Sequence, residues 1–403
     1  MSAPLKVVVA GAGLGGLTAA IALKQRGFDV TVLEQSAELG EIGAGVQLAP
    51  NAMRVARELG IEQDVLAVSY EPNRHVIRSW KSGRELATTQ LKGVLHEAFG
   101  GGYYGFHRAD LHRVLQKHFP AGRVRLGAKC VGLRQDASSV TALLEGGEEV
   151  RADALIGADG VHSAVRAALH GAESPRYTGN CCWRGVVPAK DVTPGAISPD
   201  MTVWFGPGAS FIYYYVRGGE LVNWVAMCEA PAWTSESWKY EGGRDELVER
   251  YRRWHPTVRE LIGKTDRFLK WALLDRDPLP KWTTGRATVL GDAAHPMLPY
   301  LAQGACQALE DGYEVAAELA RNPGDVPAAL ARYEERRRAR TARVQLLARS
   351  RAVENHLTSP WAQLKRNWRY AMQRLQDPKQ HTYKIEWIYG YDVTAADSAP
   401  ASS

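Results

Sequence analysis

The sequence predicts an α/β protein with a nucleotide-binding βαβ unit at its N-terminus and a second, antiparallel sheet inserted between later parts of the same lobe. Three observations predict this fold. A glycine-rich turn joins a β-branched run to an alanine-rich stretch, two later apolar runs end in aspartate, and aromatic runs separated by Gly/Pro turns follow Gly171. The 403 residues are more than one hydrophobic core usually organises, so two lobes are expected.

The first expected element is a strand over residues 6–10, whose β-branched side chains are typical of a buried parallel strand. A helix over residues 17–25 and a second strand over 29–33 follow. The turn between strand and helix has the spacing Gly-x-Gly-x-x-Gly, and an acidic residue closes the second strand, which completes the dinucleotide-binding fingerprint. The residues expected to bind a dinucleotide here are Gly11, Gly13, Gly16, Glu34 and Gln35.

The fingerprint has a physical basis. Gly11 permits the tight turn, Gly13 lets the backbone approach a pyrophosphate, and Gly16 lets the helix pack on the strand. Free N–H groups at the helix start bind phosphates. Glu34 would accept hydrogen bonds from an adenosine ribose and repel a 2′-phosphate, which indicates FAD or NAD rather than NADP at this unit.

Two later apolar strands end in an acid. Residues 153–160 lead to Asp159, with Arg166 on a probable helix beyond it, and residues 286–292 lead to Asp292. Another helix is expected to begin near Gly304. Taken singly, each run is as compatible with a purely structural strand and turn aspartate as with a ligand-binding site.

In this order and spacing, the three motifs resemble those of the single-component FAD-dependent aromatic hydroxylases, the group A flavoprotein monooxygenases, and the resemblance covers nearly the whole chain. It implies a Rossmann-like FAD-binding domain of the para-hydroxybenzoate hydroxylase type, with Asp292 on the FAD ribityl or ribose hydroxyls. It places Asp159 and Arg166 near the pyrophosphate and a passing nicotinamide. The FAD contacts that it implies outside the fingerprint are Gly45, Val46, Arg108, Asp159, Arg166, Asp292, Gly304 and Ala305.

The expected domains interleave along the chain. The FAD-binding domain takes residues 1–72, 101–176 and 284–345, and the substrate domain takes residues 73–100 and 177–283, where aromatic runs predict an antiparallel sheet. Residues 346–403 form a C-terminal helical segment and tail. The arginine-rich stretch over 328–353 predicts a solvated amphipathic helix against the core, with a nucleic-acid or membrane face as the alternative.

Composition and charge exclude several other classes. Five scattered cysteines form neither a disulfide framework nor a Cys-x-x-Cys zinc pattern, which favours a reducing, cytoplasmic location. The formal net charge of +6 would draw in small anions rather than nucleic acid. The uncharged stretch over residues 7–23 contains four glycines and is too short for a membrane span. His107 and His112 do not share a helix face, so no metal site is expected. The protein should be a monomer or homodimer.

The resemblance implies oxygenation of a small aromatic acid that carries a hydroxyl, such as a hydroxybenzoate, salicylate or a hydroxypyridine carboxylate. NADH or NADPH, with NADH favoured, would bind transiently and reduce FAD, because no second fingerprint, with Gly-x-Gly-x-x-Gly between an apolar strand and a helix, is present. O2 would add at the flavin C4a, and the resulting hydroperoxide would attack the ring ortho or para to its hydroxyl.

A base that deprotonates this hydroxyl would make the ring electron-rich, and such help typically contributes about 10²–10⁴-fold. Tyr214 is the first candidate, with Tyr300 and Gln47 orienting the ring and His295 as a weaker option. Strand alternation lets Tyr214 face the pocket alone, or Tyr213 together with Tyr215.

The particular substrate stays open. The hydroxynicotinate hydroxylases have histidine where this chain has Gln47, Ser210 and Tyr300, and no arginine stands out as a partner for a carboxylate. Two alternatives to ring hydroxylation are a flavin oxidase or reductase without oxygen insertion, and a non-catalytic flavoprotein redox sensor.

Overall fold

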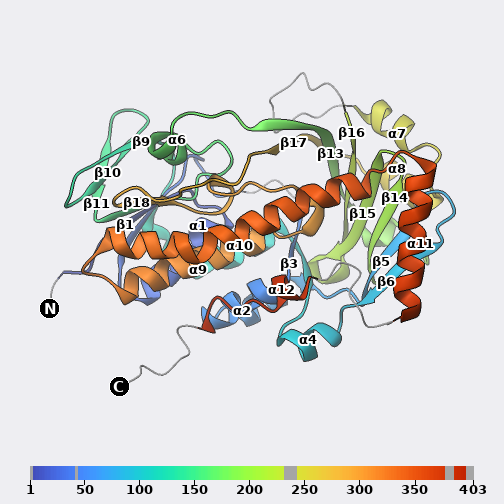
Figure 1. Cartoon of the computed structure of the whole chain (residues 1–403), viewed down its shortest axis with the longest axis horizontal. Coiled ribbons are helices and arrows are strands. Elements are labelled where there is room, and N and C mark those ends of the chain that lie inside the picture. The colour runs from blue at the N-terminus through green and yellow to red at the C-terminus, as the bar shows by residue number, and fades with distance from the viewer. Residues whose placement is uncertain (1–2, 41–43, 231–242, 377–384, 396–403) are drawn as a thin grey trace.

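The FAD lobe is built on a parallel sheet. The computed structural model describes residues 3–40, 44–230, 243–376 and 385–395, and its five-stranded sheet has the order β18-β12-β1-β2-β8 (Figure 1). β1 pairs with both β2 and β12, and β12 pairs with β18, so one acid-terminated strand lies beside the fingerprint strand and the other lies next to that strand. The strands are β1 (Lys6–Ala10), β2 (Asp29–Leu33), β8 (Val124–Arg125), β12 (Ala154–Gly157) and β18 (Ala287–Val289).

Two helices pack against each other beside this sheet. α1 (Leu14–Gln25) is buried from Leu14 to Leu23, which explains its uncharged sequence, and α9 (Gly304–Arg321) lies along it. A Cβ on Gly312 would stand 2.8 Å from the backbone nitrogen of Ala19. The two helices therefore approach at backbone distance, with both N-termini on the same side of the lobe.

The second lobe is a mixed sheet of seven strands in the order β17-β13-β16-β15-β14-β5-β6. All neighbouring pairs are antiparallel except β14 and β5, so a hairpin from early in the chain extends a sheet made later. One face packs on α7 (Arg244–Tyr251) and α8 (Pro256–Gly263) through an aromatic core. The strands are β5 (Arg74–Ser79), β6 (Glu85–Gln90), β13 (Arg176–Pro188), β14 (Met201–Gly206), β15 (Ala209–Val216), β16 (Leu221–Glu229) and β17 (Phe268–Asp275).

Two three-stranded sheets and further helices complete the described chain. The sheet β3-β7-β4 bridges the lobes, because β7 and β4 contact β15 of the larger sheet. Its strands are β3 (Gly45–Leu48), β4 (Ser69–Tyr70) and β7 (Tyr104–His107), and the other sheet comprises β9 (Cys130–Gln135), β10 (Val140–Leu144) and β11 (Glu149–Ala152). The remaining α-helices are α2 (Pro50–Glu58), α3 (Glu62–Ala67), α4 (Val94–Phe99), α5 (Arg108–Lys117), α6 (Ala164–His170), α10 (Val326–Asn355), α11 (Pro360–Gln376) and α12 (Glu386–Tyr389).

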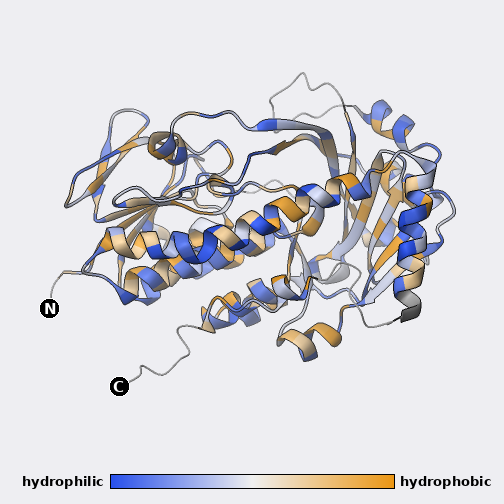
Figure 2. Ribbon diagram, in the orientation of Figure 1, coloured by the Kyte–Doolittle hydropathy of each residue, from blue (hydrophilic) through white to orange (hydrophobic). Residues whose placement is uncertain are grey.

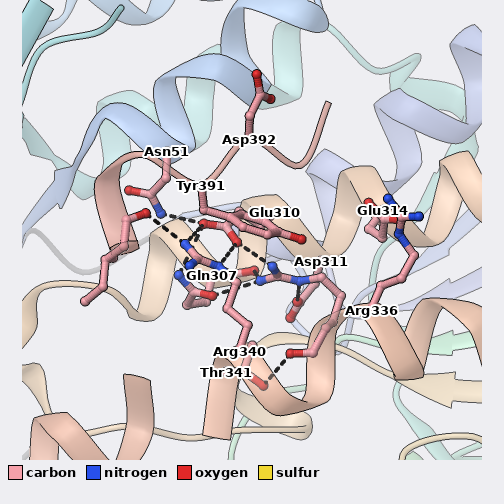
Figure 3. A network of polar contacts seen from close by, with 12 residues as sticks. Asn51, Gln307, Glu310, Asp311, Glu314, Arg336, Arg340, Thr341, Tyr391 and Asp392 are labelled. Carbon is pink, nitrogen blue, oxygen red and sulfur yellow. Dashed lines mark hydrogen bonds and ion pairs between the residues drawn. The ribbon is translucent and has the colours of Figure 1, made fainter. Parts of the chain in front are cut away.

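The long helix α10 runs from the FAD lobe to the seven-stranded sheet (Figure 1). Figure 2 shows a hydrophilic stretch on it, and two arginines of this stretch are largely buried. Arg337 is fully buried and bonds Asp311 through Nε at 2.7 Å and Glu310 through Nη1. Arg340 donates to both carboxylate oxygens of Glu310, at 2.8 and 2.9 Å (Figure 3). The expected solvated amphipathic helix against the core is therefore present, with Arg332, Arg336, Arg338 and Arg343 exposed. Arg337 and Arg340 depart from it, because they neutralise acids buried on α9.

Candidate active site

Residues of both lobes line a single cavity of about 350 Å³. The FAD lobe contributes the turn before α1, the end of β18 and the start of α9, and the seven-stranded sheet contributes side chains of β13 to β16. Among the residues expected from the sequence, the cavity is lined by Gly13, Gly16, Gly45, Val46, Gln47, Arg108, Tyr214, Asp292, Tyr300, Gly304 and Ala305.

The three fingerprint glycines have different environments. Gly11 has φ +107°, and a Cβ there would lie 2.3 Å from the Ala158 carbonyl oxygen. A Cβ on Gly16 would lie 2.0 Å from the Gly11 oxygen, so both glycines serve the packing of turn, helix and strand. Gly13 has nothing within 4 Å of its Cβ position and borders the cavity. It leaves a cradle in which a phosphate can approach the backbone.

Both α1 and α9 begin at the cavity wall. The N-terminus of a helix carries about half a positive charge. Neither helix has an acidic residue in its first turn to cancel it. One cavity wall therefore carries two positive helix ends, which suits a diphosphate at α1 and an anionic ring at α9.

Asp292 and Arg108 add opposite charges to this wall. Asp292 follows β18, and its side chain is exposed to the cavity, whose walls surround it. Burial raises the pKa of the Asp292 carboxyl, although the charges of His295 and Arg108 oppose the shift. A carboxylate beside phosphate-binding helix ends can accept hydrogen bonds from sugar or ribityl hydroxyls.

Besides Gly11, four expected cofactor residues do not line the cavity: Glu34, Gln35, Asp159 and Arg166. Glu34 accepts hydrogen bonds from the backbone nitrogens of Ala12 at 2.8 Å and Ser36 at 2.9 Å, and Gln35 is exposed beside it. Asp159 caps α6 by accepting from the backbone nitrogens of residues 164 and 165 at 2.8 and 3.1 Å. Arg166 donates to two backbone carbonyls and to a glutamate. Asp159 and Arg166 thus organise the protein around the cavity wall.

Tyr214 is the tyrosine of its strand that faces the cavity, whereas Tyr213 and Tyr215 belong to the core on the other side of the sheet. Its ring lies where two neighbouring strands carry glycine. A Cβ on Gly45 would stand 2.4 Å from the Tyr214 Oη, and one on Gly105 would stand 2.9 Å from Cδ2. Burial raises the pKa of Tyr214 above its usual value, so this phenol stays protonated at neutral pH.

The other expected catalytic residues divide into two groups. Gln47 accepts a hydrogen bond from Tyr103 at 3.0 Å and lines the cavity. Tyr300 also lines it, and burial raises the pKa of its hydroxyl. His295, by contrast, is buried against Asp311 at 2.5 Å and is not part of the lining, so it is poorly placed to accept a proton from a ligand.

Two polar lining residues were not singled out from the sequence. Arg184 on β13 stacks over Trp271 at 4.6 Å, and its Nε is buried without a hydrogen-bond partner in the described parts of the chain. In the sequence, the one sign of this role is that Arg184 is the single charged residue in the otherwise apolar run over residues 181–187. Asn355 ends α10, and its place at the cavity depends on how that helix docks, which no local pattern indicates.

These features fit FAD. The open Gly13 cradle and the α1 end suit its pyrophosphate, Asp292 suits its hydroxyls, and the α9 end suits the ring. In the described ranges, no cluster of three or more His, Cys, Asp or Glu side chains could hold a metal ion. The same ranges include no helix with the length and hydropathy of a membrane span.

Comparison with known proteins agrees with this class. Residues 4–348 match the family described as FAD binding domain, so the chain belongs to this family. Two solved structures share the fold over nearly their whole length. HpxO from Klebsiella pneumoniae, complexed with FAD and uric acid, has a TM-score of 0.83 at 29% identity and covers 98% of this chain and 97% of its own. A salicylate hydroxylase substrate complex has a TM-score of 0.82 at 27% identity, with 100% of both chains covered.

Curated relatives narrow the class to FAD-dependent aromatic-ring monooxygenases, as the sequence motifs predicted. A 3-amino-4-hydroxybenzoate 2-monooxygenase from Streptomyces cremeus is 38% identical over 98% of both chains. A 3-hydroxybenzoate 6-hydroxylase from Aquipseudomonas alcaligenes is 38% identical over 96% of this chain and 98% of its own. A 6-hydroxynicotinate 3-monooxygenase from Pseudomonas fluorescens is 34% identical over 98% and 96%.

Proposed function

We propose that the protein hydroxylates a small aromatic ring that already carries a hydroxyl and a carboxylate, with FAD as resident cofactor and NADH, or else NADPH, as transient electron donor. In the balanced reaction NAD(P)H, a proton, O2 and the ring give NAD(P)⁺, water and the hydroxylated ring. The observation that carries the proposal is the continuity of one cavity from the FAD-binding wall to the seven-stranded sheet. The relatives named above are hydroxylases of hydroxybenzoates and of a hydroxynicotinate, which supports this substrate class.

The sheet side of the cavity is suited to a flat aromatic ring. Val203, Ile212, Val225 and Met227 supply apolar surface. Such a wall excludes water and so protects reactive intermediates from unproductive decay. When bound and reduced, FAD would supply activated oxygen for transfer to the ring. The side chains of this wall would hold the ring in a fixed orientation toward that oxygen.

Arg184 is the group we propose for the substrate carboxylate. Its guanidinium borders the cavity, and no carboxylate pairs with it in the described parts of the chain. Hydrogen bonds between a guanidinium and a carboxylate are roughly twice as strong as neutral ones. An anionic ring substituent would therefore supply the carboxylate that Arg184 lacks among the described residues.

Tyr214 is the group we propose for the ring hydroxyl. Because burial keeps its phenol protonated, it can accept the proton of the substrate hydroxyl only while its own proton moves on, or it can orient that hydroxyl by hydrogen bonding. Gln47 and Tyr300 border the same space and would orient the ring from two further directions.

The test is to measure NADH and NADPH oxidation with 3-amino-4-hydroxybenzoate, 3-hydroxybenzoate, salicylate and 6-hydroxynicotinate, and to follow the product mass under ¹⁸O2. A hydroxylase oxidises the pyridine nucleotide faster with its ring substrate and places one labelled atom in the product. If every ring leaves the rate of NAD(P)H oxidation unchanged and no label enters the product, the protein is a flavin oxidase or reductase rather than a hydroxylase.

A further inference from the structure

Three polar side chains around the cavity have buried atoms without a hydrogen-bond partner in the described ranges: Asn355 Oδ1, Tyr300 Oη and Arg184 Nε. Leaving a buried polar atom unpaired costs about 1–3 kcal/mol. Groups of this kind are normally satisfied by other protein atoms, by water or by a ligand. Their convergence on one cavity indicates a set of ligand contacts that extends beyond Tyr214.

Asn355 is the most buried of the three. It is 7% exposed, it is the last residue of α10, and it borders the cavity. Neither atom of its amide is bonded to another described residue. A primary amide offers both a donor and an acceptor. It can therefore donate a hydrogen bond to a hydroxyl group or accept one from it.

The next residue, His356, fixes the end of α10 to the seven-stranded sheet. Its Nε2 lies 3.0 Å from Ser210 Oγ on β15, and its Nδ1 lies 3.0 Å from Asn180 Oδ1 on β13. Its ring also meets the Tyr300 ring edge-on, with 5.4 Å between centroids. His356 therefore joins three parts of the chain that converge behind the cavity.

The tautomer of His356 follows from its partners. Asn180 Nδ2 donates to the Thr178 carbonyl at 3.0 Å, so Asn180 Oδ1 faces the imidazole and Nδ1 must carry the hydrogen. Nε2 then accepts from the Ser210 hydroxyl. Burial, together with the charge of Arg250, lowers the pKa of His356 to about 4, so the ring is neutral at physiological pH. Both nitrogens are thus used in holding the helix end.

We propose that Asn355 is a specificity-determining residue that hydrogen-bonds the ring hydroxyl of the substrate, and that His356 is the positioning residue that holds it there. The hydroxyl is the matching group because it donates and accepts, as the amide does. A carboxylate only accepts, and Arg184 is the better partner for it. The inference rests on the proposed function and assigns a part of its specificity to the end of α10.

The test compares matched rings that differ by one hydroxyl. Dissociation constants of 3-hydroxybenzoate and benzoate, and of 6-hydroxynicotinate and nicotinate, are measured through the absorbance change of the bound flavin. The variant Asn355→Leu should weaken binding of the hydroxylated member about ten- to hundredfold and leave the other member within about twofold. Asn322→Leu, at the far end of the α9–α10 pair, is the matched control and should change neither.

His356 is tested by loss and rescue. His356→Phe should reproduce the selective loss for the hydroxylated ring, whereas His356→Gln, whose amide can replace both hydrogen bonds, should restore most of the affinity. Flavin content and thermal midpoint report whether each variant folds. Equal losses for both rings, or no loss in a folded Asn355→Leu, would overturn the inference while the proposed function stands. If the wild type binds none of these aromatic acids, the proposed function fails first.

Discussion

Arg337→Met tests whether the buried ions between α9 and α10 hold the cofactor lobe together. Arg337 and its partners Glu310 and Asp311 are fully buried, so methionine would fill the space but leave two carboxylates with one cation fewer. Breaking a buried ion pair from one side costs about 3–5 kcal/mol. Glu310 keeps Arg340 and Asp311 keeps His295, which favours the lower half of this range.

The expected change is large enough to measure in the thermal midpoint. Unfolding entropy is about 2.1 cal/mol/K per residue, so a loss of about 3–4 kcal/mol in a chain of this size lowers the midpoint by roughly 4–5 °C. The assay is flavin fluorescence and circular dichroism of the holoenzyme during heating. Arg332→Met is the matched control, because Arg332 is 47% exposed and pairs with Glu318 at 3.2 Å. Its loss should cost about 0–1 kcal/mol.

The pH dependence gives a second readout of the same change. Burial alone would raise the pKa of Asp311, but the charges of His295 and Arg337 hold it at about 2. An unfolded aspartate titrates near about 3.9, so this carboxylate stabilises the fold above that pH, and the contribution disappears as pH falls toward 2. Without Arg337 the carboxyls of Glu310 and Asp311 should take up protons in milder acid. The difference in the free energy of unfolding between wild type and variant should therefore shrink from pH 7 to pH 5. A loss of unfolding free energy below about 1 kcal/mol, or a loss that grows toward pH 5, refutes the reasoning.

Further substitutions address the cavity itself. Gly13→Ala should fold but retain less FAD, because its Cβ enters the open cradle, whereas Gly16→Ala should reduce soluble protein through the 2.0 Å clash; equal yield and flavin content for both would contradict this distinction. Tyr214→Phe should lower kcat by about 10²-fold or more with flavin content unchanged, and wild-type turnover across the pH range would remove Tyr214 from proton transfer. Gly45→Ala should displace the Tyr214 ring and give the same kinetic defect, which flavin reduction with and without substrate would detect. Arg184→Met should weaken binding of aromatic carboxylates at least tenfold relative to the corresponding phenols, and an equal loss for both classes would count against a carboxylate contact.

The cofactor side could be predicted from the sequence because its geometry is local. Gly11, Gly13 and Gly16 act within one turn, so their spacing carries the structural information. Strand alternation left two possibilities, Tyr214 alone or Tyr213 with Tyr215, and the family resemblance favoured Tyr214, which does line the cavity. Arg184 and Asn355 were missed because their positions depend on the pairing of β13 and the docking of α10. Asp159 is a different case, because its contacts are local: its carboxylate caps α6 five and six residues further along the chain and does not border the cavity.

The strand order of the parallel sheet has a consequence for how the protein is made. The fingerprint turn emerges early in synthesis, yet β12 has only β1 beside it until β18 is translated, and the cavity wall also needs the start of α9. A nascent chain therefore carries the Gly13 cradle long before it can bind FAD in full. A ligand that binds only the native state stabilises only molecules that have reached it. Cells short of riboflavin should accordingly hold less of the protein, because complete chains without a bound cofactor are less stable and more open to proteolysis.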